Sequence, residues 1–495
     1  MFTDTTVQEL EILIGKSKKA FEEYRQLPLS GRAAFMRAIG EELEKAGDEL
    51  IQIAMKETNL PEARLRNERI RTIFQLTSYA EACERGNWMD VRIDTADQQR
   101  NPPKPDIRKM LVPLGPVVVY GASNFPFAYS TAGGDTASAF AAGCSVIVKA
   151  HPAHPETSDR VSKAIKAAIS RCNLPEDIFI HVFGAAPEFG KSLITNRHIK
   201  AVGFTGSFTA GKALFDWANQ REEPIPVFAE MGSVNPVFLL PEKLKASATE
   251  MAQHYAGSIT LGAGQFCTNP GLIIGIDGPD LDSFVSALGL AISQIAPATM
   301  LHEGIAKAYV QKKSIALAQS GTSLVATGTS EEQSLKAIPT IATVNGKTFL
   351  DNPILHQEVF GPYSLVIRCT DAAEMLDVAL HLEGQLTATL MATEPDMRNH
   401  RSLVIAVQDI CGRLIMNGVP TGVEVCLSMH HGGPYPATTD ARFSSVGADA
   451  IKRFARPVAY QNWPDSLLPD ELKNANPLSI WRTVNNEITN KEITA

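Results

Sequence analysis

The sequence predicts an α/β protein with two doubly wound parallel sheets. From residue 116 onwards, short runs of Val and Ile alternate with helical segments, and a second series of such runs follows residue 235. This alternation is typical of parallel strands connected by crossover helices. Because 495 residues exceed the usual size of one domain, we expect two α/β domains of similar size that meet near residue 230.

The elements can be predicted in chain order. Residues 5–85 are expected to form helices, one of which is capped by Ser30 and buries Phe35, Ile39 and Leu43. Prolines within residues 94–112 interrupt the helical pattern and predict an extended excursion. Strands are then expected at 116–120, 145–150, 178–183, 200–206 and 225–230, and in the second series at 235–240, 271–276, 338–343, 363–368, 386–392 and 413–417.

Composition excludes several classes of partner. The 46 Lys and Arg residues against 54 Asp and Glu give a net charge of -8 without a basic block, so we expect no nucleic-acid partner. The N-terminus lacks the features of a signal peptide, and the longest apolar stretch, residues 111–122, is too short to cross a bilayer. Seven cysteines without a C-x-x-C pair predict neither a zinc site nor a disulfide scaffold. We therefore expect a cytoplasmic protein with no membrane partner and no metal.

Five separated segments contain residues suited to chemistry. Cys267 lies in LGAGQFCTNPG, between an apolar helical run and a turn. Asn124 follows the first expected strand, ahead of a helix predicted to begin near Ser130. Glu230 ends a strand beside a flexible glycine. The remaining two segments place Gly206 and Ser207 where a strand turns into a helix, and Glu358 and Phe360 in a sharp loop. Each segment, taken singly, is equally compatible with a turn, a solvated strand end or a core position.

Two other patterns are poor candidates for a site. Residues 184–192, GAAPEFGKS, have five residues between their glycines instead of the four of a phosphate-binding P-loop. Four histidines lack the carboxylates and the spacing of a metalloenzyme helix, so we expect them to be structural or exposed: His151, His154, His430 and His431.

Together, the five segments resemble the aldehyde dehydrogenase superfamily over nearly the whole chain. GQFC is similar to the nucleophile segment of that family, EMG to its general-base segment, NFP to its oxyanion segment, FTGS to its coenzyme-phosphate turn and EVFGP to its nicotinamide-ribose loop. The resemblance implies two Rossmann-like domains plus a small oligomerisation arm, assembled as a homodimer or homotetramer. The implied ranges are 1–90, 112–229 and 431–477 for the coenzyme-binding domain, 230–430 for the catalytic domain, and 91–111 and 478–495 for the arm.

The resemblance also implies a role for each reacting residue. Cys267 is similar to the nucleophile, which attacks an aldehyde as a thiolate to form a thiohemiacetal. The Asn124 side chain and the Cys267 backbone N–H would stabilise the oxyanion. After hydride transfer, Glu230 would activate water to hydrolyse the thioester. The presence of this glutamate argues against the acylating branch of the family, which transfers the acyl group to coenzyme A.

For the coenzyme, the resemblance points to the strand ends. Gly206 and Ser207 would bind phosphate at a helix N-terminus, Lys149 would hold the adenosine ribose, and Glu358 and Phe360 would position the nicotinamide ribose and ring. Members that prefer NAD commonly carry a glutamate three residues after the lysine, where this chain has Pro152. A carboxylate there would repel a 2′-phosphate. We therefore expect NADP as the coenzyme, with NAD as the second candidate and Lys191 as the candidate cation for the 2′-phosphate.

The flanking residues point to a subgroup. Ser123 stands where the family usually has a tryptophan, and residues 149–158, 268–270 and 430–465 resemble bacterial α-ketoglutarate semialdehyde (2,5-dioxopentanoate) dehydrogenases. A long-chain (fatty) aldehyde dehydrogenase that uses NADP is the alternative. A keto-acid aldehyde requires a cation, ideally arginine, whereas a fatty aldehyde requires an apolar tunnel. The candidate substrate residues are Arg69, Arg71, Phe125, Thr268 and Arg442.

Two further classes of function remain open. A cysteine hydrolase would pair Cys267 with a histidine and would need no coenzyme, but it would leave Glu230 and the two coenzyme segments unexplained. A binding protein that has lost its activity would have no reason to retain Cys267, Asn124 and Glu230 together.

Overall fold

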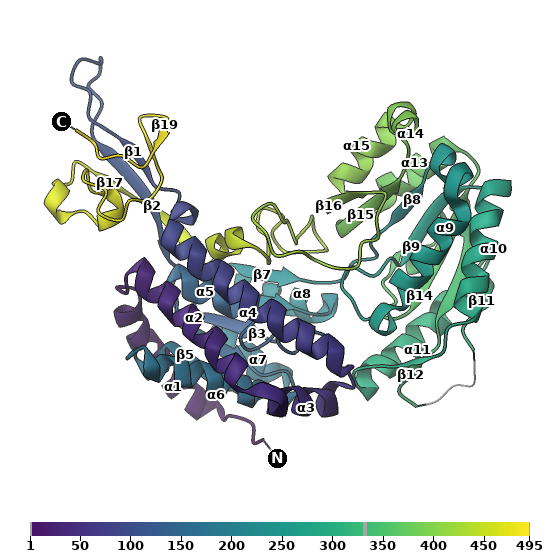
Figure 1. Cartoon of the computed structure of the whole chain (residues 1–495), viewed down its shortest axis with the longest axis horizontal. Coiled ribbons are helices and arrows are strands. Elements are labelled where there is room, and N and C mark those ends of the chain that lie inside the picture. Colours follow the sequence, from purple (N-terminus) through teal and green to yellow (C-terminus); the bar gives the residue numbers. More distant parts are fainter. Residues whose placement is uncertain (1, 330–333, 495) are drawn as a thin grey trace.

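The fold has three parts, each built on its own sheet (Figure 1). The structure is a computed structural model that describes residues 2–329 and 334–494. Two α/β domains lie beside each other, and a smaller β arm that carries the C-terminus extends away from them. In the part of the chain that the structure describes, no helix is both long and apolar enough to cross a membrane.

The N-terminal region is helical, as predicted. Its helices are α1 (Val7–Tyr24), α2 (Leu29–Lys45), α3 (Gly47–Thr58) and α4 (Glu62–Arg85). Phe35, Ile39 and Leu43 are buried along one face of α2, as their helical spacing indicates. The prediction of Ser30 as the cap was wrong, because Pro28 occupies the N-cap position and no side chain caps this helix. Ser30 therefore lies inside the first turn.

The first sheet contains the five strands predicted before residue 230. They are β3 (Val117–Tyr120), β4 (Val146–Lys149), β5 (Phe179–Val182), β6 (Ala201–Thr205) and β7 (Val227–Glu230), all parallel in the order β5-β4-β3-β6-β7. The crossover helices are α5 (Gly134–Ala142), α6 (Pro155–Arg171), α7 (Pro187–Thr195) and α8 (Phe208–Asn219). Both faces are covered, since Val117 and Val119 pack with α2, α5 and α6 while Val118 packs with α1, α7 and α8.

The helix that follows Asn124 begins later than predicted. We expected its start near Ser130, but α5 begins at Gly134. Hydrogen bonds from Gly133 N to the Ser130 carbonyl and from Gly134 N to the Ala128 carbonyl close tight turns first. The segment that contains Asn124 is therefore held in a folded loop before the helix starts.

The second sheet contains all six strands predicted after residue 235. They are β8 (Val237–Leu239), β9 (Leu272–Ile276), β13 (Thr340–Asn345), β14 (Tyr363–Cys369), β15 (Gln385–Met391) and β16 (Cys411–Met416). A seventh strand, β11 (Ser323–Thr327), was not predicted and pairs antiparallel at one edge, which gives the order β11-β13-β14-β9-β8-β15-β16. The helices are α9 (Pro241–Thr260), α10 (Pro279–Ser293), α11 (Glu303–Leu317), α12 (Gly346–Asp351), α13 (Ala372–His381), α14 (Glu394–Asn399) and α15 (Arg401–Asp409).

Short elements complete the chain. A two-stranded ribbon pairs β10 (Ala298–Thr299) with β12 (Lys336–Ala337). The 3₁₀ turns are η1 (Asn87–Met89), η2 (Glu176–Ile178), η3 (Leu261–Gly264), η4 (Pro353–His356), η5 (Ala448–Phe454), η6 (Asp465–Leu467) and η7 (Asp470–Leu472).

The arm is larger than the sequence indicated. Its sheet has the order β17-β2-β1-β18-β19, formed by β1 (Arg92–Asp94), β2 (Ile107–Pro113), β17 (Ala455–Gln461), β18 (Arg482–Val484) and β19 (Glu487–Thr489). Strand β17 pairs with the whole of β2 although residues 431–477 were predicted to belong to the coenzyme domain. The arm therefore includes a strand that lies well before residue 478, and β2 continues past residue 111.

Candidate active site

Residues from three strand ends meet at one crevice of the first sheet. From β3 the chain moves through β4 to β5 at one edge, and from β6 to β7 at the other, so the crossovers diverge between β3 and β6. Such a divergence leaves a crevice at the carboxyl ends of the strands, where ligands bind in doubly wound sheets. Asn124 follows β3, Ser207 follows β6 and Glu230 ends β7.

The cysteine loop belongs to the second domain and is held by close backbone packing. Gly264 has a φ of 66°, and a Cβ there would overlap the carbonyl group of Gly361. Only glycine fits such a position. The Asn235 side chain donates hydrogen bonds of 2.9 Å to the carbonyls of Cys267 and Asn269. These contacts bring the EVFGP loop and Cys267 together at the crevice.

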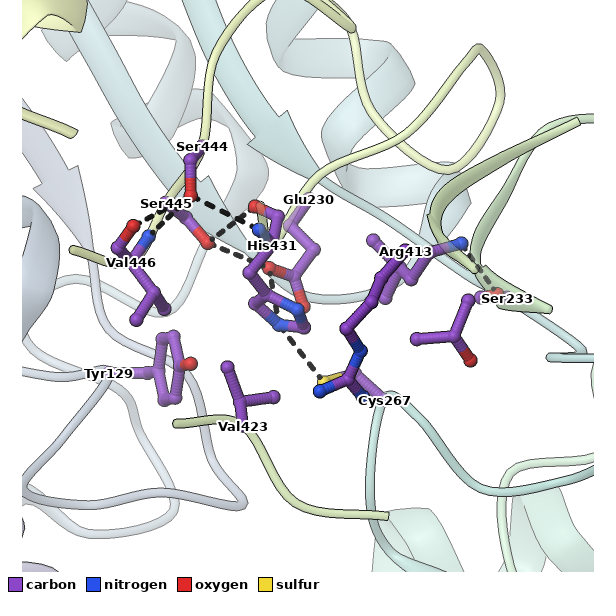
Figure 2. Close-up of polar contacts among 12 residues, drawn as sticks. Tyr129, Glu230, Ser233, Cys267, Arg413, Val423, His431, Ser444, Ser445 and Val446 are labelled. Atoms are coloured by element: carbon purple, nitrogen blue, oxygen red, sulfur yellow. Dashed lines mark hydrogen bonds and ion pairs between the residues drawn. The ribbon is translucent and has the colours of Figure 1, made fainter. Parts of the chain in front are cut away.

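Cys267 is half-buried and lies against two ionisable side chains (Figure 2). Its Sγ is 3.6 Å from His431 Nε2, and the ligand atoms of Cys267, His431 and Glu230 all lie within 4.8 Å of one another. Burial and the negative charge of Glu230 raise the pKa of the Cys267 thiol well above its ordinary value. The resting sulfur is therefore a thiol at neutral pH, and the reaction needs a group that removes its proton.

His431 lies closer to Cys267 than the sequence indicated. We expected it to be structural or exposed, and it is buried, with its Nε2 3.2 Å from Glu230 Oε2 and 3.6 Å from Cys267 Sγ. The segment after it runs beside β7, where Met231 N donates to the Ala437 carbonyl at 2.8 Å. The glycines of HHGGP were the available signal, because a Cβ at Gly433 would overlap the carbonyl oxygen of Gln385. They let the segment approach the second sheet closely enough to deliver the imidazole.

The other three histidines have no contact of this kind with Cys267. His154 is buried and its Nε2 bonds to the carbonyl of Ala122 at 2.9 Å, which is a structural role. His151 stacks on it with a centroid separation of 5.4 Å. His430 is half-buried beside His431.

Glu230 is buried but its environment favours the carboxylate. Burial alone would raise its pKa, yet the charge of His431 and hydrogen bonds from His431, Cys267 and Ser445 outweigh it and lower the pKa below the ordinary value. Ser445 Oγ donates to Glu230 Oε2 at 3.2 Å. Glu230 Oε1 is buried and has no hydrogen-bond partner among the described residues. One oxygen is thus held in place while the other remains available to a water molecule.

Asn124 lies next to the cysteine loop. Its Nδ2 donates to the carbonyl of Gln265, two residues before Cys267, at 3.2 Å. Arg64 Nη2 donates to the Asn124 carbonyl at 2.7 Å and fixes the loop from the side of α4. An amide nitrogen carries two N–H groups, so Asn124 retains a donor for an oxyanion at this position.

Two of the candidate substrate residues also lie at this position. Phe125 makes edge-to-face contacts with Tyr129 and Phe266, at centroid distances of 5.3 and 5.6 Å. Thr268 is buried directly after the nucleophile.

Three of the predicted coenzyme residues lie at strand ends of the first sheet. Gly206 and Ser207 are exposed, and Ser207 caps the N-terminus of α8 by accepting from Ala210 N at 3.4 Å. Lys149, at the end of β4, donates to the Gly184 carbonyl at 3.1 Å. The exposed N-terminus of the twelve-residue helix α8 and the lysine that ends β4 are groups that suit the phosphates and the ribose of a dinucleotide.

The remaining coenzyme candidates are more dispersed. Burial raises the pKa of Glu358 to about 7. A Cβ on residue 232 would lie 2.9 Å from Glu358 Oε2, so a glycine at this position leaves room for the carboxyl group. Phe360 follows it in the same half-buried loop. Pro152 is exposed in the turn after β4, and Lys191 is exposed on α7 with its Nζ 6.0 Å above the Trp217 ring.

The predicted arginines differ in whether their side chains reach the crevice. Arg71 reaches the crevice, where its Nη2 lies 3.4 Å from both the Tyr129 hydroxyl and the Val423 carbonyl. Arg69 points elsewhere, to the Gly47 carbonyl at 2.7 Å. Arg442 was a wrong candidate, since its side chain is 81% exposed and pairs with Asp440 at 2.6 Å. A further arginine, Arg413 of β16, extends toward Cys267 (Figure 2) and was not predicted.

Comparison with known proteins shows the family of the chain. Residues 1–434 match the model of the aldehyde dehydrogenase family. The chain is 47% identical to "Alpha-ketoglutaric semialdehyde dehydrogenase 2" of Azospirillum brasilense, over 94% of this chain and 89% of that protein. It is 44% identical to "Alpha-ketoglutaric semialdehyde dehydrogenase" of Acinetobacter baylyi, over 99% of this chain and 93% of that protein.

Solved structures share the fold at lower identity. Glyceraldehyde-3-phosphate dehydrogenase of Methanocaldococcus jannaschii, solved with NADP, superposes with a TM-score of 0.78 at 19% identity, over 93% of this chain and 95% of that one. Succinic semialdehyde dehydrogenase of Streptococcus pyogenes, solved with NADP⁺, gives a TM-score of 0.77 at 17% identity, over 93% and 96% of the two chains.

Proposed function

Because the chain belongs to the aldehyde dehydrogenase family, we propose that it oxidises α-ketoglutarate semialdehyde to α-ketoglutarate. The observation that carries the reaction is the convergence of Cys267, Glu230 and Asn124 at one crevice. The substrate is supported by relatives of 44–47% identity over nearly the whole chain, both of which are named for this semialdehyde.

The first step requires a thiolate. In the neutral tautomer whose Nε2 carries no proton, His431 makes no hydrogen bond to Glu230 and can accept the thiol proton, because this nitrogen is 3.6 Å from the Cys267 sulfur. The resulting imidazolium lies 3.2 Å from the Glu230 carboxylate, which stabilises the charge. The thiolate adds to the aldehyde carbon and forms a thiohemiacetal, whose oxyanion accepts hydrogen bonds from the Asn124 side chain and the Cys267 backbone.

The second half of the reaction releases the acid. A coenzyme held by the α8 N-terminus at Gly206 and Ser207 would supply the acceptor for the hydride that leaves the substrate carbon, and a thioester would then remain on Cys267. Glu230 Oε1, which has no partner among the described residues, then holds and deprotonates the attacking water. Collapse of the tetrahedral adduct returns the sulfur and frees the carboxylic acid. This role for Glu230 supports hydrolysis over acyl transfer to coenzyme A.

We further infer that NADP is accepted. The helix N-terminus at Gly206 and Ser207 would hold the phosphates, with Lys149 at the ribose. Pro152, exposed in the turn after β4, provides no carboxylate to repel a 2′-phosphate. Lys191 on α7 is the candidate cation for this phosphate. It lines a surface cavity of about 560 Å³ together with Arg197 and Arg221. If kcat/KM for NAD exceeded that for NADP tenfold or more, the inference would be wrong.

The arm is proposed to mediate assembly into a homodimer or homotetramer. Several of its large apolar side chains are exposed, among them Leu467 at 65%, Trp481 at 53% and Ile488 at 76%. Strand β19 also leaves one edge of the arm sheet unpaired within the described residues. Light scattering of the full chain tests this assembly, and a monomer at micromolar concentration would contradict it.

The substrate is tested by competition between aldehydes. We expect kcat/KM for α-ketoglutarate semialdehyde to exceed that for every member of a plain aldehyde series at least tenfold. Rates that rise with alkyl length would instead support the fatty-aldehyde alternative. The two relatives described above do not support that alternative, because both are named for α-ketoglutaric semialdehyde. His431 supplies the histidine that a cysteine hydrolase would need, but strict dependence on NAD(P) would exclude that class.

A further inference from the structure

Two arginines from different domains converge beside the nucleophile. Arg71 lies on α4 and Arg413 on β16, and both bond to one loop of the chain. Arg71 Nη2 lies 3.4 Å from the Val423 carbonyl, while Arg413 donates to the carbonyls of Pro420 at 2.7 Å and Gly422 at 3.0 Å. Figure 2 shows Arg413 extending toward Cys267, with Val423 and Tyr129 nearby.

Both guanidinium groups retain buried donors that nothing satisfies. Arg71 Nη1 and Arg413 Nε are buried and have no hydrogen-bond partner among the described residues. Within the same residues, neither side chain forms an ion pair within 4.0 Å. Elsewhere, buried Arg453 pairs with Asp135 at 2.8 Å. Leaving charged donors buried without an anion is costly.

The charges around the two arginines leave room for an anion. Glu68 on α4 acts electrostatically on Arg71, but its Oε1 is taken by the backbone amides of Phe127 and Ala128, at 2.8 and 3.0 Å. A thiolate at Cys267 acts on both guanidinium groups, which places them within electrostatic range of the reacting sulfur. A second anion near the sulfur would therefore meet two cations.

We propose that Arg71 and Arg413 together bind the carboxylate of the substrate while its aldehyde carbon lies at Cys267. The proposal rests on the proposed function and deepens it: the substrate class is a short aldehyde with a carboxylate at its far end. Two planar guanidinium groups match the two oxygens of a carboxylate, and a 2-oxo group beside it offers a further acceptor. The aromatic cluster of Phe125, Tyr129 and Phe266 lies on the same side and covers the carbon chain.

The first test compares two aldehydes of five carbons. Arg71→Met and Arg413→Met should each lower kcat/KM for α-ketoglutarate semialdehyde roughly tenfold to a hundredfold and leave pentanal almost unchanged. Arg413→Lys should recover part of the loss, because it restores the charge without the planar pair of donors. Arg442→Met is the control and should change neither substrate. Equal losses on both aldehydes, or no loss on either, would overturn the proposal.

A second test needs neither turnover nor coenzyme. Iodoacetate and iodoacetamide both alkylate Cys267, but only iodoacetate carries a carboxylate. The rate of alkylation by iodoacetate divided by the rate for iodoacetamide should be lower in Arg71→Met and in Arg413→Met than in the unaltered chain. It should be lowest in the double variant. Melting temperatures near that of the unaltered chain exclude unfolding as the cause. An unchanged ratio in the double variant refutes the anion site.

The two proposals can fail separately. If the unaltered chain shows no preference for the keto-acid aldehyde over pentanal, the proposed substrate is wrong whatever the variants do. If that preference exists and the arginine variants retain it, the substrate stands and the assignment of the two arginines is wrong.

Discussion

Replacing Glu230 with glutamine should have opposite effects on two properties of Cys267. Glutamine cannot act as a base, so hydrolysis of the thioester should slow by about 10²- to 10⁴-fold, equivalent to about 3 to 5 kcal/mol in the barrier. Formation of the thioester does not use Glu230 as its base, because His431 Nε2 is 3.6 Å from the sulfur. The change removes only the carboxylate that stabilises the resulting imidazolium, so this step should slow less than hydrolysis. A first turnover should therefore remain visible as an early release of NADPH, close to one equivalent per chain.

The same change should make the resting thiol more reactive. The negative charge of Glu230 is one of the causes that raise the pKa of Cys267. Without it that pKa is lower, so the thiolate fraction at a given pH is larger and alkylation by iodoacetamide is faster. In the unaltered chain, the raised pKa predicts an alkylation rate that keeps climbing with pH beyond the range of an ordinary thiol.

Both effects can be measured on one preparation. Rapid mixing with aldehyde and NADP gives the early release and the steady-state rate, and labelling without coenzyme gives the alkylation rate across pH. Cys267→Ala is the control and should show neither the early release nor labelling at this position. Normal turnover in Glu230→Gln would refute the general-base role, and slower alkylation would refute the electrostatic argument.

Three further predictions concern neighbouring parts of the site. His431→Asn should lower kcat/KM for the aldehyde about 10²- to 10⁴-fold, measured with saturating NADP. It should also weaken inhibition by Zn²⁺, since imidazole and the thiolate of Cys267 are zinc ligands. Unchanged kinetics would remove His431 from the mechanism. Pro152→Glu should shift the ratio of kcat/KM toward NAD at least tenfold, because the new carboxylate repels the 2′-phosphate; an unchanged ratio would place the phosphate elsewhere. Gly264→Ala should destabilise the chain by about 1 to 3 kcal/mol in denaturant unfolding, since its φ is 66° and its Cβ would overlap Gly361; a stable, fully active variant would contradict the packing argument.

Local sequence patterns were sufficient for the secondary structure and for much of the site. Each of the eleven predicted strand positions contains a strand, because alternation between Val/Ile runs and helical periodicity is a property of neighbouring residues. Cys267, Asn124 and Glu230 could be proposed as site residues because each lies in a short segment with a recognisable order of residues. Helix starts were less accurate, as at Ser30, since a cap depends on the backbone turn as well as on the residue type.

Tertiary structure decided what touches the nucleophile. His431 lies 164 residues after Cys267, and its sequence neighbourhood, without carboxylates, led to a structural interpretation. Only the packing of the segment after His431 along β7, with Gly433 against Gln385, brings the imidazole to the sulfur.

The arginines and the arm follow the same rule. Arg413 was not predicted as a substrate residue because nothing distinguishes its position from any other in a strand. Arg442 was a candidate for binding the substrate, but its side chain is exposed. The place of strand β17 in the arm was missed because its partner strand β2 lies more than three hundred residues earlier in the chain. The periodic elements and the candidate reactive side chains could be predicted from the sequence, because their signals are local. The long-range packing of strands and glycines determined which charges and which base surround Cys267, because contacts between distant segments leave no periodic trace in either segment.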